Sequence, residues 1–231
     1  MAVAFDAVSN ANNENNAGTT MSWTHTPVAS PPSSVAVLLQ IYNDASNSVT
    51  GITYNSVALT KKTTATSGSQ GGFSSHTEIW GSDGLTLPSG AQTVQITFAA
   101  TGSYCQAGAI SVTGSDTTTC FSNAAVADNP SSTTPSVNVT SATGELVVDI
   151  TANSAGLTGS TPGSGQTSRF GYNPAGLFAG DSSTKAGAAS VTMSWTLSGA
   201  QSWTISAASF KAAGGGGGGT RPRTLPMLGV G

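Results

Sequence analysis

Charged side chains are scarce in this sequence. Asp, Glu, Lys and Arg make up 7% of its 231 residues, against roughly 25% in an average globular protein. The seven Lys and Arg are spread over the whole chain, so the basic stripe with which proteins bind nucleic acid is missing. Disordered chains usually combine a high net charge with few β-branched residues, whereas this chain has a net charge of −3 and regular runs of Val, Ile and Thr. We therefore expect a folded protein that does not bind nucleic acid.

Long apolar runs and a cysteine framework are also lacking. No apolar run approaches the ~20 residues that span a bilayer, so we expect no membrane insertion. Residues 1–6 lead directly into a strand-like segment without a basic and apolar leader. This favours export by assembly and lysis, with a leader that was trimmed and replaced by Met as the alternative. Cys105 and Cys120 are expected to be free thiols, with a disulfide between them as the alternative.

Motifs that carry enzymatic chemistry are missing as well. The sequence has no nucleophile elbow, no phosphate-binding loop, no zinc-ligand spacing and no run of calcium-binding carboxylates. His25 is expected at the end of a strand. His76 and Glu78 are two residues apart and would share one face of a strand, either as a surface contact or as half of a site without a visible third member. We therefore predict that the protein is not an enzyme and has no metal and no cofactor.

The patterns around the aromatic residues and around several aspartates favour structural roles, in the core and in turns. Trp23 and Trp195 alternate with apolar residues and are expected in the core. Trp80 and Tyr54 lie close to turns, so either could be an exposed ring that stacks on a glycan, although core packing is the favoured interpretation. Four aspartates fall in turn-like contexts, where Asp caps its own backbone: Asp44, Asp83, Asp116 and Asp181.

The dominant pattern is an alternation of apolar and polar residues in short segments bounded by Gly, Asn, Asp, Ser and Pro. Residues 35–41 are nearly continuous in apolar side chains, which is typical of a central strand covered on both faces. No segment has the apolar period of a long helix. The predicted strands are residues 20–24, 35–41, 52–60, 77–81, 92–99, 107–113, 136–140, 145–151, 166–171, 189–197 and 202–211.

The two halves of the chain resemble each other weakly. Both two small sandwiches and one jelly roll with interleaved strands would explain this repeat. No Pro-rich linker separates the halves, and residues 129–135 are the nearest candidate hinge. We therefore predict an all-β fold, an antiparallel β-sandwich that is jelly-roll-like and forms one body over residues 1–212. The corresponding segments are residues 94–98 with 191–195, 109–112 with 207–210, 21–24 with 137–140, and 34–41 with 144–150.

The composition changes abruptly after Lys211. Six glycines at residues 214–219 form a flexible spacer. Beyond them, Pro222 and Pro226 favour an extended conformation. We predict that residues 213–231 are a spacer and a docking peptide, which binds a neighbour by strand addition or in a groove, with an expression scar or a frayed end as the alternative. The predicted docking residues are Arg221, Arg223, Leu225, Met227, Leu228 and Val230.

Several segments carry turn and strand motifs that resemble a known group of modules. They are VTGITYNSVALT at residues 49–60, EIW at 78–80, PSGAQTV at 88–94 and AGAISVTG at 107–114, with a weaker match at 186–191. The resemblance is to β-sandwich modules of poorly defined function that occur in bacterial surface proteins and in virion structural proteins. It covers residues 3–212, excludes the glycine-rich tail and transfers no catalytic residue.

Two functions are compatible with these observations. The first is a non-enzymatic virion structural protein, a capsid decoration or cement protein of a tailed phage that is exposed on the virion surface. Its partners would be capsid or other virion proteins in a homo-oligomer or lattice, and its tail would dock on a neighbour. The second is a carbohydrate-binding or adhesive module of an extracellular bacterial surface protein, with Trp80 or Tyr54 at the glycan.

Overall fold

Strands form the regular structure of this protein. The computed structural model describes residues 1–13, 18–42, 49–66, 75–100, 104–153, 160–173 and 178–214. In these ranges the chain forms 17 strands, and it has no helix long and apolar enough to cross a membrane. The strands of the first half are β1 (Ala4–Asn13), β2 (Thr20–His25), β3 (Ser34–Tyr42), β4 (Val49–Tyr54), β5 (Val57–Ala58), β6 (Thr60–Thr66), β7 (Ser75–Gly81), β8 (Gln92–Phe98) and β9 (Tyr104–Thr113). Those of the second half are β10 (Phe121–Ser132), β11 (Ser136–Thr140), β12 (Leu146–Asn153), β13 (Ser160–Pro162), β14 (Thr167–Tyr172), β15 (Gly180–Ala186), β16 (Ser190–Leu197) and β17 (Gln201–Phe210).

Each half of the chain forms its own pair of antiparallel sheets. In the first half, a five-stranded sheet of order β1-β9-β3-β7-β6 packs on a four-stranded sheet of order β2-β8-β4-β5. In the second half, a five-stranded sheet of order β10-β17-β12-β15-β14 packs on a three-stranded sheet of order β11-β16-β13. The predicted all-β, antiparallel sandwich fold is confirmed.

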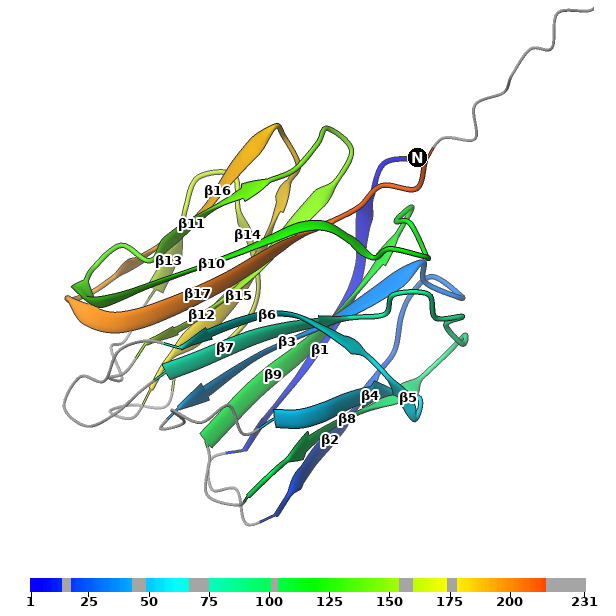
Figure 1. Ribbon diagram of the computed structural model, residues 1–231, viewed down its shortest axis with the longest axis horizontal. Helices are drawn as coiled ribbons and strands as arrows, with labels where there is room; N and C mark the ends of the chain where they lie inside the picture. Colours follow the sequence, from blue (N-terminus) through cyan, green and yellow to red (C-terminus); the bar gives the residue numbers. More distant parts are fainter. Residues whose placement is uncertain are drawn as a thin grey trace, which may run out of the picture.

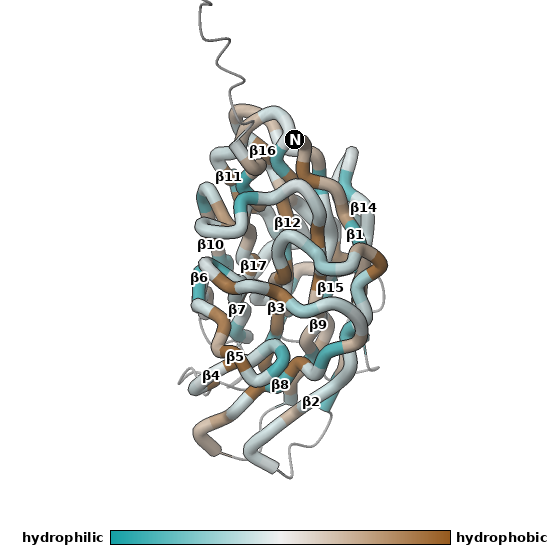
Figure 2. Tube along the Cα trace, turned by 90° about the vertical axis from the view of Figure 1, so that its right-hand side faces the viewer, coloured by the Kyte–Doolittle hydropathy of each residue, from teal (hydrophilic) through white to brown (hydrophobic). Residues whose placement is uncertain are grey.

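The four sheets stack as four layers, because the two five-stranded sheets face each other (Figures 1 and 2). Three hydrophobic cores lie between the layers. The first core, which contains Val37, lies inside the first half. The inter-half core brings Leu38 of the first half together with Ile150 of the second. The third core, which contains Val147 and Met193, lies inside the second half.

This layering explains the two patterns in the sequence. All nine residues of β3 are buried, because one face of its sheet packs in the first core and the other in the inter-half core. In contrast, β8 and β16 belong to the outer layers, and their buried residues alternate with more exposed ones. A central strand therefore reads as a continuous apolar run and an outer strand as an alternating one.

The strand order of the second half follows that of the first. When β10, β12, β14, β15 and β17 are matched to β1, β3, β6, β7 and β9, the two five-stranded sheets have the same order. No described sheet contains strands from both halves. The expectation of interleaved strands is therefore wrong, and the sheets are those of the alternative with two sandwiches.

The candidate hinge at residues 129–135 is also corrected. Asn129 and Pro130 belong to β10, which continues to Ser132. Pro130 is tolerated there because β10 is an edge strand, where the missing N–H does not break a ladder on the free side. The halves are instead joined by residues 114–120, which connect β9 to β10.

Some strand boundaries differ from the prediction for local reasons. The predicted strand at residues 52–60 is divided, because Asn55 and Ser56 have positive φ angles of 51° and 62° and form the turn between β4 and β5. Four strands, β6, β10, β13 and β15, were not predicted because they contain mostly small or polar residues. Their neighbours in the sheet provide the apolar burial that these strands lack.

Glycine permits the close approach of the two halves. A Cβ atom at Gly108, on β9, would lie 2.4 Å from the Phe170 ring of the opposite half. A Cβ atom at Gly180, on β15, would lie 2.3 Å from the side chain of Gln40 and 2.5 Å from a backbone oxygen of Thr151. These two glycines therefore set the distance between the five-stranded sheets.

The first and last described segments meet beside the joint between the halves. The Val3 N–H donates to the Gly144 carbonyl at 2.7 Å, and the Ala213 N–H donates to the Gly114 carbonyl at 2.9 Å. Gly114 has a φ of 74°, and a Cβ atom there would lie 2.3 Å from the Ala2 carbonyl oxygen. Figure 1 shows the N-terminus next to the segment that follows β17.

Candidate functional site

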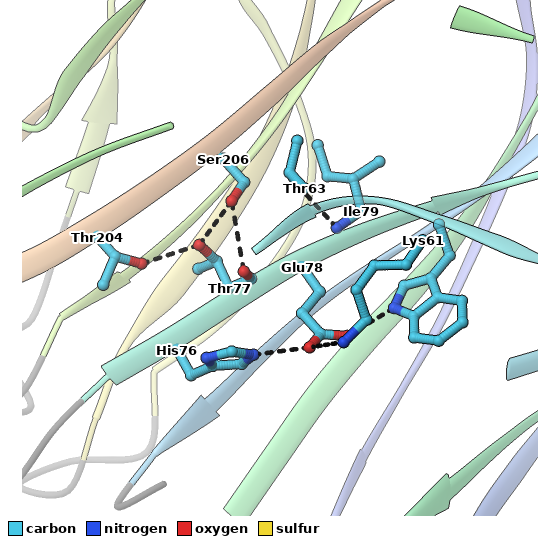
Figure 3. A network of polar contacts seen from close by, with 9 residues as sticks. Lys61, Thr63, His76, Thr77, Glu78, Ile79, Thr204 and Ser206 are labelled. Atoms are coloured by element: carbon cyan, nitrogen blue, oxygen red, sulfur yellow. Dashed lines mark hydrogen bonds and ion pairs between the residues drawn. The ribbon is translucent and has the colours of Figure 1, made fainter. Parts of the chain in front are cut away.

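A network of charged and polar side chains surrounds Glu78, on β7 (Figure 3). Glu78 is fully buried on the same sheet face as Trp80, which belongs to the first core. Its Oε1 lies 2.6 Å from the Lys61 Nζ and 2.8 Å from the His76 Nε2. Its Oε2 accepts a hydrogen bond of 2.6 Å from the Trp80 Nε1. We name these four residues the Glu78 cluster.

The register of β6 and β7 assembles this cluster. Lys61 lies opposite Trp80, and the register shifts between Lys61 and Thr63. The Lys61 ammonium therefore reaches Glu78 and also lies 5.0 Å from the centre of the Trp80 ring. A cation at this distance is attracted to the face of an indole, so Lys61 is held by both partners.

The chemistry of the Glu78 cluster is that of a buried ion pair. A carboxylate in a protein interior is costly unless it is paired and hydrogen-bonded, and here an ammonium, an imidazole and an indole N–H surround it. Glu78 and His76 have no exposed side-chain surface, whereas the Lys61 side chain is 29% exposed. A general acid or base must reach its substrate. We therefore interpret the cluster as an anchor that fixes the edge strand β6 to β7.

The opposite face of β7 joins the two halves through hydroxyl groups (Figure 3). The Thr77 Oγ1 lies 2.8 Å from the Thr204 Oγ1 and 2.9 Å from the Ser206 Oγ, both on β17. All three side chains are buried. The contact between the five-stranded sheets is thus polar beside Thr77 and apolar around Leu38, so hydrogen bonds as well as apolar packing fix the position of the halves.

A second buried carboxylate, Asp149, lies in the middle of β12. Its Oδ1 accepts hydrogen bonds from the N–H and the hydroxyl of Ser183 at 2.7 and 2.8 Å, and its Oδ2 accepts one from the Trp195 Nε1 at 2.8 Å. No Lys or Arg among the described residues forms an ion pair with it. Burial outweighs the three donors and raises the pKa of Asp149 to about 7.

Asp181 was predicted in a turn but lies in β15, so that prediction is wrong. Its carboxylate accepts a hydrogen bond from the Ser160 hydroxyl. Burial raises the pKa of Asp181. The turn prediction failed because the Gly-Asp-Ser pattern of residues 180–182 resembles a turn, whereas Gly180 is required for the approach of Gln40.

The two rings predicted as glycan contacts are both buried. Trp80 is 7% exposed and Tyr54 is 1% exposed, and both pack in the first core. The exposed-ring alternative is therefore wrong for these two residues, and the core interpretation is confirmed. The four-stranded sheet covers Trp80 on β7, and the five-stranded sheet covers Tyr54 on β4, a relationship that depends on tertiary packing. Aromatic rings with partial exposure are found instead at Tyr104 and Tyr172, beside the seam between the halves.

The structure describes the two cysteines, His25 and Asp116, whereas Asp44 and the predicted docking residues lie outside the described ranges. Both cysteines are buried thiols, with Cys105 in the first core and Cys120 in the inter-half core. His25 ends β2, as predicted. The turn role of Asp116 is confirmed, because its carboxylate accepts the N–H groups of Thr118 and Thr119. Asp44 and all predicted docking residues lie outside the described ranges: Arg221, Arg223, Leu225, Met227, Leu228 and Val230.

The sequence pointed to one pair of the Glu78 cluster but missed its other members. The spacing of His76 and Glu78 predicted a shared face, whereas Lys61 joins them only through the register of two strands. Asp149 could have been found from the sequence, because a charged residue within the apolar run of β12 indicates a buried carboxylate.

Neither the described residues nor the known proteins compared with this chain point to a metal site or a family. The described residues contain no group of three or more His, Cys, Asp or Glu side chains that could hold a metal ion. No model of a known protein family matches the chain, and no significant match was found among curated proteins or solved structures.

Replacing Glu78 by glutamine is expected to lower the free energy of unfolding by roughly 3 kcal/mol, because Lys61 then loses its charged partner in a buried setting. Chemical denaturation followed by circular dichroism measures this change. Asp116→Asn is the matched control, because it neutralises the more exposed ion pair with Lys211 and is expected to cost less than about 1 kcal/mol. Equal losses in the two variants would contradict the anchoring role of the cluster.

Proposed function

We propose that this chain is a non-enzymatic structural protein of a virus particle, a decoration or cement protein on the capsid of a tailed phage. The body would cover a joint between capsid subunits, and the tail after Gly214 would dock on a neighbour. Its partners would be capsid or other virion proteins, and its location the virion surface. The observation that carries this proposal is the neutral surface of the two outer sheets.

The outer face of the four-stranded sheet supports close packing against neighbours. Its outward positions pair hydroxyl with hydroxyl or amide across the strands, as in Thr20 with Thr97 and Ser22 with Gln95. None of the outward residues in β2, β8 and β4 is charged. Removing such neutral groups from water costs much less than removing charges, so this face can lie against another protein without a charged partner.

The outer face of the second half has the same chemistry. Asn138 on β11 lies opposite Thr192 on β16, and the Thr192 hydroxyl donates to the Asn138 Oδ1 at 2.6 Å. The other outward residues of β11 and β16 are Ser and Thr. The body therefore presents two neutral faces on opposite sides of the stack, which suits a protein that is surrounded by neighbours in a lattice.

The buried carboxylates support a durable body without a reactive centre. Glu78 and Asp149 accept hydrogen bonds from side chains or backbone of the body itself. Glu145 accepts them from Ser122, Ser141 and Ser209. Groups satisfied in this way rigidify a core, and rigidity is what a protein that reinforces a shell requires.

Deletion of residues 214–231 tests the proposal. The shortened protein is expected to retain its circular dichroism spectrum but no longer to co-sediment with purified capsids that bind the full chain. A variant that replaces the six glycines by six serines is the control, because it keeps a flexible spacer and should bind as the full chain does. Undiminished binding by the shortened protein would remove the tail from the proposal, and a full chain that fails to bind capsids would end it.

A carbohydrate-binding module is the second candidate, and an aromatic cluster favours it. Phe178 lies 5.5 Å from Tyr42 and 5.9 Å from both Tyr104 and Tyr172. Tyr104 and Tyr172 are partly exposed, and exposed rings stack on sugars through their apolar faces. The expected result for this candidate is glycan-array binding that is lost on Tyr104→Ala and Tyr172→Ala. Binding that both changes leave intact would exclude this cluster.

A further inference from the structure

We propose that the free edge of β10 is the docking site for residues 223–227 of a second copy of this chain. This inference rests on the proposed structural function and names the partner of the tail. It makes the tail an added β-strand, paired antiparallel with β10 of its neighbour. Repetition of this contact from copy to copy would join the bodies into a chain or lattice.

The edge of β10 is long and regular. β10 is the longest described strand, with 12 residues, and it pairs with β17 on one side only. Its register is uninterrupted from Asn123 to Asn129, between two shifts at its ends. Figure 2 shows β10 at the side of the molecule, between β11 and β6. An edge of this length offers a row of backbone groups to an incoming strand.

The middle of this edge, residues 123–127, lacks the usual protection. Residues 123–127 of β10 are uncharged, and Ala125 and Ala127 pack against the third core. Val126 points to the other face and is 47% exposed, one of the few large apolar side chains with such exposure in the described part. Natural edge strands usually carry lysines or other charges that prevent pairing. The other edges of the two five-stranded sheets carry such charges: Asp6 on β1, Lys61 and Lys62 on β6, and Arg169 on β14.

The sequence of the tail fits this edge in one register. Antiparallel pairing of Leu225 with Val126 places Met227 opposite Ala124 and Arg223 opposite Asp128, all on one face of the sheet. The apolar residues then meet each other, and opposite charges meet at the next position. Pro226 falls opposite Ala125, and the absence of its N–H is tolerated in an added edge strand.

The direction of the tail favours a second copy over its own body. The chain leaves the body after β17, at the end where β10 begins (Figure 1), because Phe210 pairs with Phe121. A tail that followed its own β10 from there would run parallel to it. Parallel pairing with Leu225 opposite Val126 would bring Met227 to Asp128 and Arg223 to Ala124, which removes the charge match. Every strand pair in the described body is antiparallel.

The test measures self-association of the full chain by sedimentation over a wide concentration range. The wild type is expected to associate with rising concentration. Val126→Lys is expected to raise the dissociation constant at least about tenfold, because a lysine on an edge opposes strand pairing. Val57→Lys on β5 is the matched control, because Val57 is 46% exposed on another edge strand, and it should leave association unchanged.

A charge reversal tests the register itself. Asp128→Arg and Arg223→Asp are each expected to weaken association by roughly twofold to fivefold, because like charges then face each other. The variant with both changes is expected to recover association, because the pair is restored with opposite sign. Failure of this recovery would overturn the register, and equal effects of Val126→Lys and Val57→Lys would overturn the β10 site.

The outcomes separate this inference from the proposed function. A full chain that stays monomeric at every concentration overturns the inference, and capsid binding that still depends on residues 214–231 would then leave the proposed function intact. Hydrogen exchange gives an independent readout, because the amides of residues 123–127 should gain protection as protein concentration rises. Protection that is independent of concentration would mean that the tail binds its own body, which also overturns the inference.

Discussion

Replacing Leu38 by alanine is expected to lower the free energy of unfolding of the entire protein by about 2–5 kcal/mol. Leu38 is fully buried in the inter-half core, with Ile79 and Ile110 from its own sheet and Val148 and Ile150 from the second half. The cavity left by the change would be lined by both halves. Since each half depends on the other to cover its five-stranded sheet, we expect the two halves to unfold in one transition.

The control for this prediction is the neighbouring residue. Leu39 is also fully buried, but it points into the first core, inside the first half. Leu39→Ala should therefore have a loss of similar size, and urea denaturation should give one shifted transition for each variant. If Leu39→Ala shifted one of two separate transitions, the halves would be independent folding units and the prediction of a single transition would be wrong.

Asp149→Asn is expected to gain stability relative to the wild type as the pH rises from about 4 to 7. Burial raises the pKa of Asp149 from its ordinary value of 3.8 to about 7, so the folded protein favours the protonated carboxyl group. The unfolded chain ionises first, and the wild type therefore loses stability as the pH rises between these two values. A shift of this size corresponds to roughly 4 kcal/mol.

The amide in this variant removes the charge and one acceptor. The donors from Ser183 and Trp195 need two oxygen atoms, and Asn offers one, so the variant has a constant loss of about 1–3 kcal/mol at every pH. The pH-dependent part is therefore the decisive one. Melting temperatures of both proteins from pH 4 to 8 should give a difference that grows in favour of Asn and levels off above pH 7.

Two other groups define the controls for this titration. Hydrogen bonds from Lys211, Thr119 and Thr118 lower the pKa of Asp116 to about 2. Its contribution is therefore complete above pH 3.8, and Asp116→Asn should give a difference that is constant from pH 4 to 8. Burial lowers the pKa of His25 to about 4, so its contribution is lost as the pH falls from 6.5 to 4. The stability contribution of His25 thus rises with pH, whereas that of Asp149 falls, so the two partly cancel in the pH dependence of the wild-type melting temperature.

Much of the strand content could be predicted from the sequence, because the alternation of apolar and polar residues depends only on neighbours in the chain. The continuous run of residues 35–41 correctly indicated a covered central strand, and residues 92–99 were correctly predicted as a strand. The strands β6, β10, β13 and β15 were not predicted, because they contain mostly small and polar residues and are placed only by pairing with their neighbours in the sheet. Turn residues gave both successes and errors, as Asp116 and Asp181 show.

The candidate residues were less accessible to sequence reasoning because they meet through register. His76 and Glu78 are close in the chain, whereas Lys61 reaches Glu78 from another strand, next to a register shift. For Trp80 and Tyr54, the position close to turns left exposure open as an alternative to core packing, because each ring is covered by the sheet opposite its own. An exposed or buried position depends on which sheet packs above, and no local pattern contains that information.

The sequence by itself determined an all-β chain with few charges, a structural interpretation of its tryptophans, and a tail of distinct composition. These follow from residue type and short-range spacing, which act before any long-range contact forms. Only the tertiary structure decided that each half closes its own pair of sheets, that the five-stranded sheets face each other, and that β10 keeps a free edge. The reason is that a β-sheet is held by pairs between distant segments, so its order and register depend on the packing of the whole chain.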